Sequence, residues 1–115
     1  MTAAIIDRAT FENLQATAGA DFVRELVETF LVEAPRMLDE LKASLAAGDA
    51  ERFRRVAHSL KSNSNTFGAL TLGAMAKSLE LGGLGAAREA DGKALSQLAN
   101  EYARVAQTLG ELKRA

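Results

Sequence analysis

The C-terminal segment of the chain carries the pattern that most limits the fold. Apolar side chains recur there at alternating steps of three and four residues, which is the spacing of a heptad repeat. A helix with one such apolar stripe is stable mainly when the stripe packs against other helices. The composition agrees, because 23 Ala and 16 Leu against seven Ile plus Val favour helix over strand. The stripe consists of Leu95, Leu98, Tyr102, Val105, Leu109 and Leu112.

Glycines divide the rest of the chain into further helical segments. We expect long helices over residues 21–47, 50–67 and 70–81, and a short helix that ends at Gly19. The connections between them are short, so successive helices should run antiparallel. The sequence predicts a single all-α domain over residues 1–115, an antiparallel four-helix bundle with a short additional N-terminal helix.

Composition excludes several classes of function. The net charge is −1, from 14 Lys and Arg against 15 Asp and Glu, so no basic excess indicates a nucleic-acid partner. The chain has no Cys, which removes disulfides, thiol catalysis and thiolate metal sites, and its one His cannot form a multi-histidine metal cluster. No phosphate-binding glycine loop, signal peptide or membrane-length apolar run occurs. We therefore expect a soluble cytoplasmic domain with no membrane partner and no cofactor of its own.

The single histidine, His58, lies on the polar face of the expected helix over residues 50–67. On a helical wheel the core residues Phe53, Val56, Leu60 and Phe67 fall on the opposite side. A neutral imidazole nitrogen is a nucleophile near pH 7, and Lys61 is one turn away, where it can reach an anion on the ring. The same face offers further candidate contacts for a partner. Arg54 and Arg55 suit an acidic surface, and the small or uncharged Ser62 and Asn65 leave room beside the ring. Spacing and charge alone leave open that His58 is an ordinary solvated residue.

The segment from Ala57 to Ala69 resembles the signature of histidine-containing phosphotransfer (HPt) domains. It has a histidine, an apolar residue two positions on, a lysine three positions on, small residues, and an apolar-Gly-Ala ending. Specific similarity to the family extends from Ile5 to Leu84. Matching positions outside the motif include Ile6-Asp7, Phe11, Leu14, Gly48-Asp49 and Leu79-Glu80.

The resemblance implies a role for two residues of the motif. His58 would accept a phosphoryl group from the phosphoaspartate of a response-regulator receiver domain and pass it on in a phosphorelay. Lys61 would stabilise the phosphoryl group. Ser62 departs from the family pattern, which usually has glycine after the lysine, and its hydroxyl bears on partner preference.

The same resemblance implies the partners and the kind of activity. Receiver domains, and a hybrid sensor histidine kinase as a further partner, would dock on a carrier that has no independent turnover. We expect this carrier to be a monomer, because a closed helical bundle needs no second copy. Mg²⁺ would belong to the receiver. The main alternative is a helical protein-interaction module without phosphate chemistry. A kinase dimerisation domain is disfavoured because Ser59 and Asn63 stand where that family usually has an acid and a proline, and a hydrolase lacks a nucleophile motif.

Overall fold

The computed structural model describes residues 5–114, which form five α-helices and one short 3₁₀ helix. The elements are α1 (Arg8–Ala18), α2 (Ala20–Ala47), α3 (Ala50–Thr66), α4 (Leu70–Arg88), η1 (Glu89–Gly92) and α5 (Lys93–Arg114). The all-α prediction is confirmed. The helices expected over residues 21–47 and 50–67 are α2 and α3, whose ends lie within about one residue of the expected positions.

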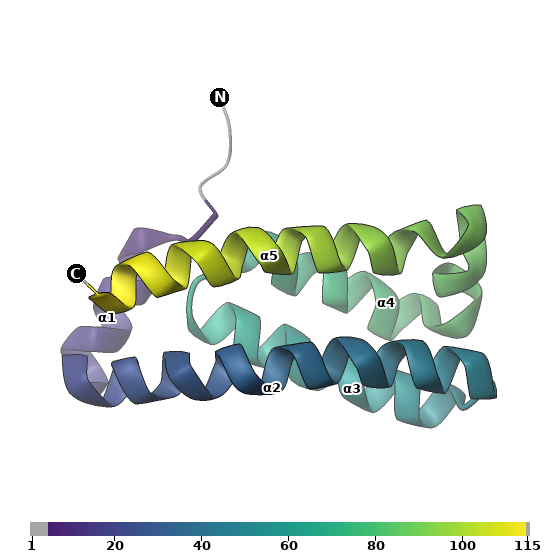
Figure 1. Cartoon of the computed structure of the whole chain (residues 1–115), viewed down its shortest axis with the longest axis horizontal. Coiled ribbons are helices and arrows are strands. Elements are labelled where there is room, and N and C mark those ends of the chain that lie inside the picture. The colour runs from purple at the N-terminus through teal and green to yellow at the C-terminus, as the bar shows by residue number, and fades with distance from the viewer. Residues whose placement is uncertain (1–4, 115) are drawn as a thin grey trace.

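Helices α2 to α5 form the predicted antiparallel four-helix bundle (Figure 1). Each helix packs against its neighbour in the chain, and α5 also packs against α2, which closes the bundle. The short helix α1 lies at the end of the bundle where α2 begins and α5 ends, and it contacts α2 and α3. None of the helices between residues 5 and 114 combines the length and hydropathy of a membrane-spanning segment.

The core contains the apolar stripes that define the helices. On α5, Leu98, Val105 and Leu109 are fully buried, as the heptad spacing predicts. On α3, Phe53 and Leu60 are also fully buried, so this helix is fixed in rotation with its polar face outward. Burial of such side chains contributes about 1.5–3 kcal/mol each. The orientation of the histidine-bearing face therefore follows from the core residues behind it.

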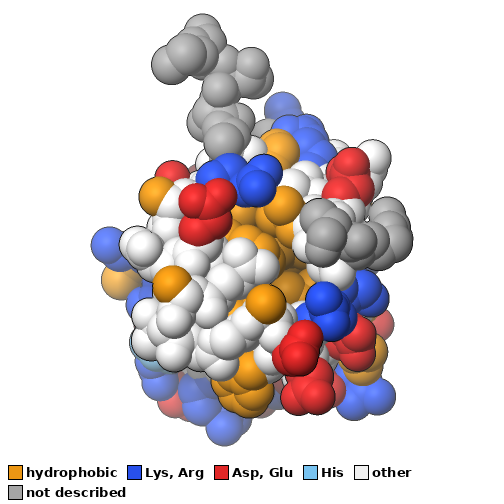
Figure 2. All heavy atoms as spheres, turned by 90° about the vertical axis from the view of Figure 1, so that its left-hand side faces the viewer, with side chains coloured by type: hydrophobic (Ala, Val, Ile, Leu, Met, Phe, Trp, Pro, Cys, Tyr) orange, Lys and Arg blue, Asp and Glu red, His pale blue; other side chains and the backbone are white. Residues whose placement is uncertain are grey.

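Some apolar side chains reach the surface at the end of the bundle that α1 covers. Figure 2 looks onto this end and shows apolar side chains near its centre, with charged side chains around them. A small hollow lies there between α1, α2 and α5, lined in part by Phe11, Val27 and Leu112. It lies among helix ends and does not include His58.

Local signals set the helix boundaries near the site. Asp49 caps α3 by accepting a hydrogen bond from the backbone N–H of Arg52 at 3.1 Å. At the other end, Gly68 has a φ of +86°, and its carbonyl accepts a hydrogen bond of 2.8 Å from the N–H of Asp7. A Cβ at Gly68 would lie 2.7 Å from the carbonyl oxygen of Asp7. Glycine is therefore required here for its conformation and for the close approach of the α1 cap.

The fourth helix breaks at Gly83, next to the end near residue 81 that the sequence predicts, but the helical residues between this break and Arg88 were not predicted. Helical structure continues to Arg88, although it is interrupted at Gly83, where φ is 66° and ψ is −154°. A glycine takes up this conformation without the steric cost of a Cβ, so the chain breaks the helix for one residue and then resumes it. The segment up to the break carries Glu80, which contributes to the site described next.

Candidate functional site

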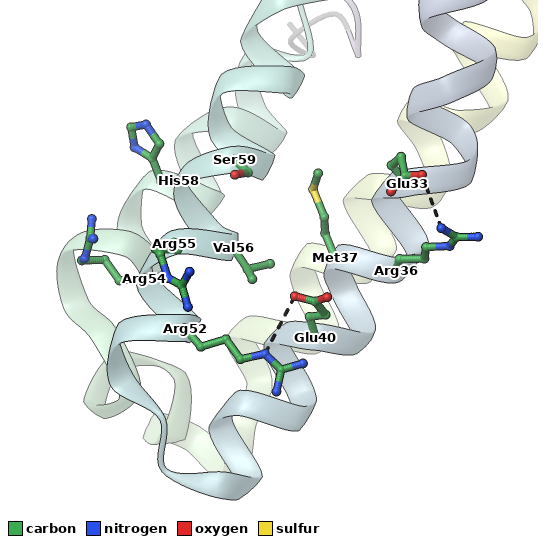
Figure 3. A pocket seen from close by; sticks show the side chains of 10 residues that line it. All are labelled: Glu33, Arg36, Met37, Glu40, Arg52, Arg54, Arg55, Val56, His58 and Ser59. Carbon is green, nitrogen blue, oxygen red and sulfur yellow. Dashed lines mark hydrogen bonds and ion pairs between the residues drawn. The ribbon is translucent and has the colours of Figure 1, made fainter.

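His58 lies in the middle of α3 on its exposed face. Its side chain is 53% exposed, although the same helix buries Phe53 and Leu60 completely on the opposite side. Figure 3 shows the imidazole ring directed away from the helix, at the rim of a groove. The exposure expected from the helical wheel is thus observed, and the ring is accessible to a second molecule.

Glu80 of α4 contacts the imidazole ring and a nearby cation at the same time. Its Oε2 lies 2.8 Å from His58 Nδ1, and its Oε1 lies 3.1 Å from Lys61 Nζ. The carboxylate is the most sheltered member of the group, with 13% of its side chain exposed against 23% for Lys61. The sequence analysis included Glu80 among matching positions but did not identify it as a site residue.

The charge on Glu80 determines which nitrogen of a neutral His58 ring carries the proton. The ion pair with Lys61 and, second, the hydrogen bond with His58 lower the pKa of Glu80 from its ordinary value of 4.5. An ionised carboxylate only accepts hydrogen bonds, so Nδ1 of His58 is the donor. In a neutral ring the other nitrogen, Nε2, then holds the lone pair. The contact therefore selects one tautomer and leaves Nε2 as the nucleophilic nitrogen.

The remaining predicted residues are exposed on α3, the helix of His58, and the two arginines among them are already paired. Arg54 donates to Glu51 at 2.7 Å, and Arg55 lies 4.0 Å from the same carboxylate. The hydrogen bond with Arg54 is the largest cause of the lowered pKa of Glu51. Both arginines are exposed, so these pairs contribute little to stability and can exchange for contacts with a partner.

Ser62 and Asn65 continue the exposed face toward the end of α3. Asn65 lies against α4, where its side chain occupies the space that a Cβ at Gly73 would need. The missing side chain at Gly73 therefore lets the Asn65 amide lie over α4. Among the residues that the structure describes, neither Ser62 nor Asn65 forms a hydrogen bond or ion pair with His58.

A groove between α2 and α3 adjoins His58 (Figure 3). Val56 of α3 and Met37 of α2 supply its apolar part, and charged side chains form its edges. Two ion pairs lie along it, Arg36–Glu33 at 3.5 Å and Arg52–Glu40 at 3.9 Å. The α2 side of this surface was missed in the sequence analysis, which considered only residues on the helix of His58.

The groove continues into a second, more apolar hollow along the same two helices. The two share Glu33 and Met37, and the second is lined also by Leu26, Phe30 and Phe67. An exposed surface of mixed apolar and charged character beside an exposed imidazole suits a protein partner. Within residues 5–114, no group of three or more His, Asp or Glu side chains is arranged to hold a metal ion.

Comparison with known proteins agrees with this geometry. The family model described as "Hpt domain" matches residues 25–108. The structure is similar to that of histidine-containing phosphotransfer protein B from Pseudomonas aeruginosa PAO1, with a TM-score of 0.88 and 28% sequence identity over 98% of this chain and 97% of that one. No curated protein sequence matches the chain. The chain belongs to the Hpt family, the histidine phosphotransfer domains of phosphorelays.

Proposed function

We propose that His58 is the residue of this domain that carries the phosphoryl group, and that Nε2 is the nitrogen that bonds to phosphorus. The observation that carries the proposal is the contact between Nδ1 and Glu80 at 2.8 Å on a side chain that is 53% exposed. This contact orients the ring and leaves the Nε2 lone pair for attack. Because His58 is the one histidine of the chain, phosphotransfer through histidine has a single candidate.

The proposed reaction is a reversible transfer between two proteins. Nε2 attacks the phosphorus of a receiver phosphoaspartate in line with the bond that breaks, so catalysis rests on positioning and charge compensation. Lys61 supplies the compensation. It is held 3.1 Å from Glu80 before transfer and is one helical turn from His58, so its ammonium can reach the phosphoryl oxygens while it stays beside Glu80.

The docking surface proposed for the receiver is centred on His58. It comprises the predicted contacts Arg54, Arg55, Ser62 and Asn65 together with the groove on the α2 side. Support comes from the character of this surface: Met37 and Val56 offer an apolar contact, and the exposed arginines suit an acidic partner. Ser62 is exposed, so its hydroxyl is available to a docked receiver and is one candidate determinant of partner preference.

We further infer that the domain acts as a monomeric cytoplasmic carrier without turnover of its own, and that the receiver supplies Mg²⁺. The arrangement of Glu80 supports this division of labour. Both of its carboxylate oxygens already face protein cations or donors, Lys61 on one side and His58 on the other, so this carboxylate is not free to bind a metal ion.

The test is transfer of label from a ³²P-phosphorylated receiver domain to the purified protein. Wild type should acquire an acid-labile, base-stable label, and His58→Gln should acquire none. Because His58 is exposed, its replacement opens no cavity, and the far-ultraviolet circular dichroism spectrum should stay helical. Label on a folded His58→Gln variant would refute the assignment. Binding of the receiver by wild type without any label would favour the alternative of an interaction module without phosphate chemistry.

A further inference from the structure

Glu80 contacts both groups that the proposed chemistry uses. One oxygen lies 2.8 Å from His58 Nδ1 and the other 3.1 Å from Lys61 Nζ, and the carboxylate is largely sheltered between α3 and α4. The inference developed from this geometry rests on the proposed function of His58.

The transfer step changes the charge of the ring. The Nε2 lone pair forms the N–P bond, and the P–O bond of the aspartyl phosphate breaks with its electron pair leaving on the aspartate carboxylate. No proton leaves the ring in this step. The product is therefore a phosphorylated imidazolium that still holds the Nδ1 proton, and part of its positive charge lies at Nδ1, which in the unphosphorylated domain is 2.8 Å from Glu80 Oε2.

We propose that Glu80 keeps this proton on Nδ1 of the phosphorylated ring, and that the retained proton is what makes the phosphoryl group transferable onward. In the onward step an aspartate oxygen of the next receiver attacks phosphorus, and the N–P electron pair returns to Nε2. With the Nδ1 proton in place, the departing group is a neutral imidazole. Without it, the departing group is an imidazolate anion, which is a far poorer leaving group.

Lys61 makes this arrangement compatible with a phosphoryl group nearby. A carboxylate beside a phosphohistidine would repel it, but the ammonium on the other oxygen of Glu80 offsets that charge at 3.1 Å. Glu80 is thus a positioning residue that acts through His58, because it touches the ring and not the phosphorus.

The experiment uses the intact domain phosphorylated with phosphoramidate, a donor that needs no protein partner. Onward transfer is then measured in single turnover to a Mg²⁺-loaded receiver domain chosen because it accepts label from wild type. Glu80→Gln keeps a hydrogen-bond acceptor but removes the charge, and we expect transfer to slow about tenfold or more. Glu12→Gln is the matched control, because Glu12 pairs with Arg8 on α1, away from the ring, and should transfer at the wild-type rate.

A second readout reports on the proton itself. In the phosphorylated wild type, the ¹⁵N signal of His58 Nδ1 should show a bound proton, and in phosphorylated Glu80→Gln at the same pH the bound fraction should fall. Repeating both measurements in a Lys61→Met background separates an effect through the ring from one through the ammonium. The Glu80→Gln effect should persist there.

Two results would overturn the inference: onward transfer by Glu80→Gln at the wild-type rate, or a wild-type phosphohistidine whose Nδ1 carries no proton. The proposed function has its own point of failure in the same experiment. If phosphoramidate labelled a residue other than His58, the assignment of the acceptor would be wrong before any onward transfer was measured.

Discussion

Replacing Lys61 tests the charge compensation on which the proposed transfer depends. Its ammonium is 3.1 Å from Glu80 and its side chain is 23% exposed, so it lies between bulk water and a sheltered site. Opposite unit charges about 4 Å apart attract by about 1 kcal/mol in water and about 4 kcal/mol at an effective dielectric constant of about 20. Because Lys61 must divide its charge between Glu80 and the phosphoryl group, we expect a contribution to the barrier of about 1.4–2.7 kcal/mol, or about ten- to a hundredfold in rate.

The assay is single-turnover transfer from a phosphorylated receiver at saturating concentrations of the domain, which separates the chemical step from docking. Lys61→Met keeps the apolar stem without the ammonium and should show the full loss. Lys61→Arg should keep part of the rate, because the charge remains but its geometry changes. Equal rates for Lys61→Met and wild type would refute the electrostatic role and leave Lys61 as a partner of Glu80 alone.

Three further predictions concern the stability of the fold. Leu60→Ala should lower the free energy of unfolding by about 2–5 kcal/mol, because this side chain is fully buried. Arg55→Ala should change it by less than about 0.5 kcal/mol, because Arg55 is exposed. Similar urea midpoints for the two variants would contradict the packing. Gly68→Ala and Gly48→Ala both place alanine at positive φ, at a cost of about 1–2 kcal/mol each. Only at Gly68 would the new Cβ meet a backbone carbonyl, so Gly68→Ala should lower the melting temperature more than Gly48→Ala does. The pKa of Glu80 is lowered from 4.5 in the folded state, so its contribution to stability is present above pH 4.5 and is lost as the pH falls through the lowered pKa. The difference in melting temperature between wild type and Glu80→Gln should accordingly shrink below pH 4.5, and a constant difference down to pH 2 would argue against the ionised contact.

The helical framework could be predicted because it depends on local patterns. The heptad spacing from Leu95 to Leu112 and the caps around Asp49 report helix faces and ends directly. The break of α4 at Gly83 could be predicted as well, but the return of helical structure between Gly83 and Arg88 could not. A glycine pair in a sequence indicates where a helix can break, but it does not show whether helical structure continues beyond the break.

The site was predicted only on the helix that contains His58. The wheel correctly placed the ring and its cationic neighbours on the outer face, since that follows from Phe53 and Leu60 facing the core. Glu80 is 22 residues from His58 along the chain, and their contact depends on how α3 and α4 are aligned. Met37 lines the groove because α2 packs against α3, so its position also depends on how two helices are aligned. Interactions between helices are set by tertiary packing, which one helical wheel does not describe.

The most direct test of the account is to locate the phosphorus atom on the ring. Uniformly ¹⁵N-labelled domain, phosphorylated by a receiver or by phosphoramidate, can be examined by ³¹P–¹⁵N correlation spectroscopy. The contact of Nδ1 with Glu80 predicts that phosphorus couples to Nε2 of His58. Phosphorus bonded to Nδ1, or to a residue other than His58, would contradict the assignment of the nucleophile and the role given to Glu80.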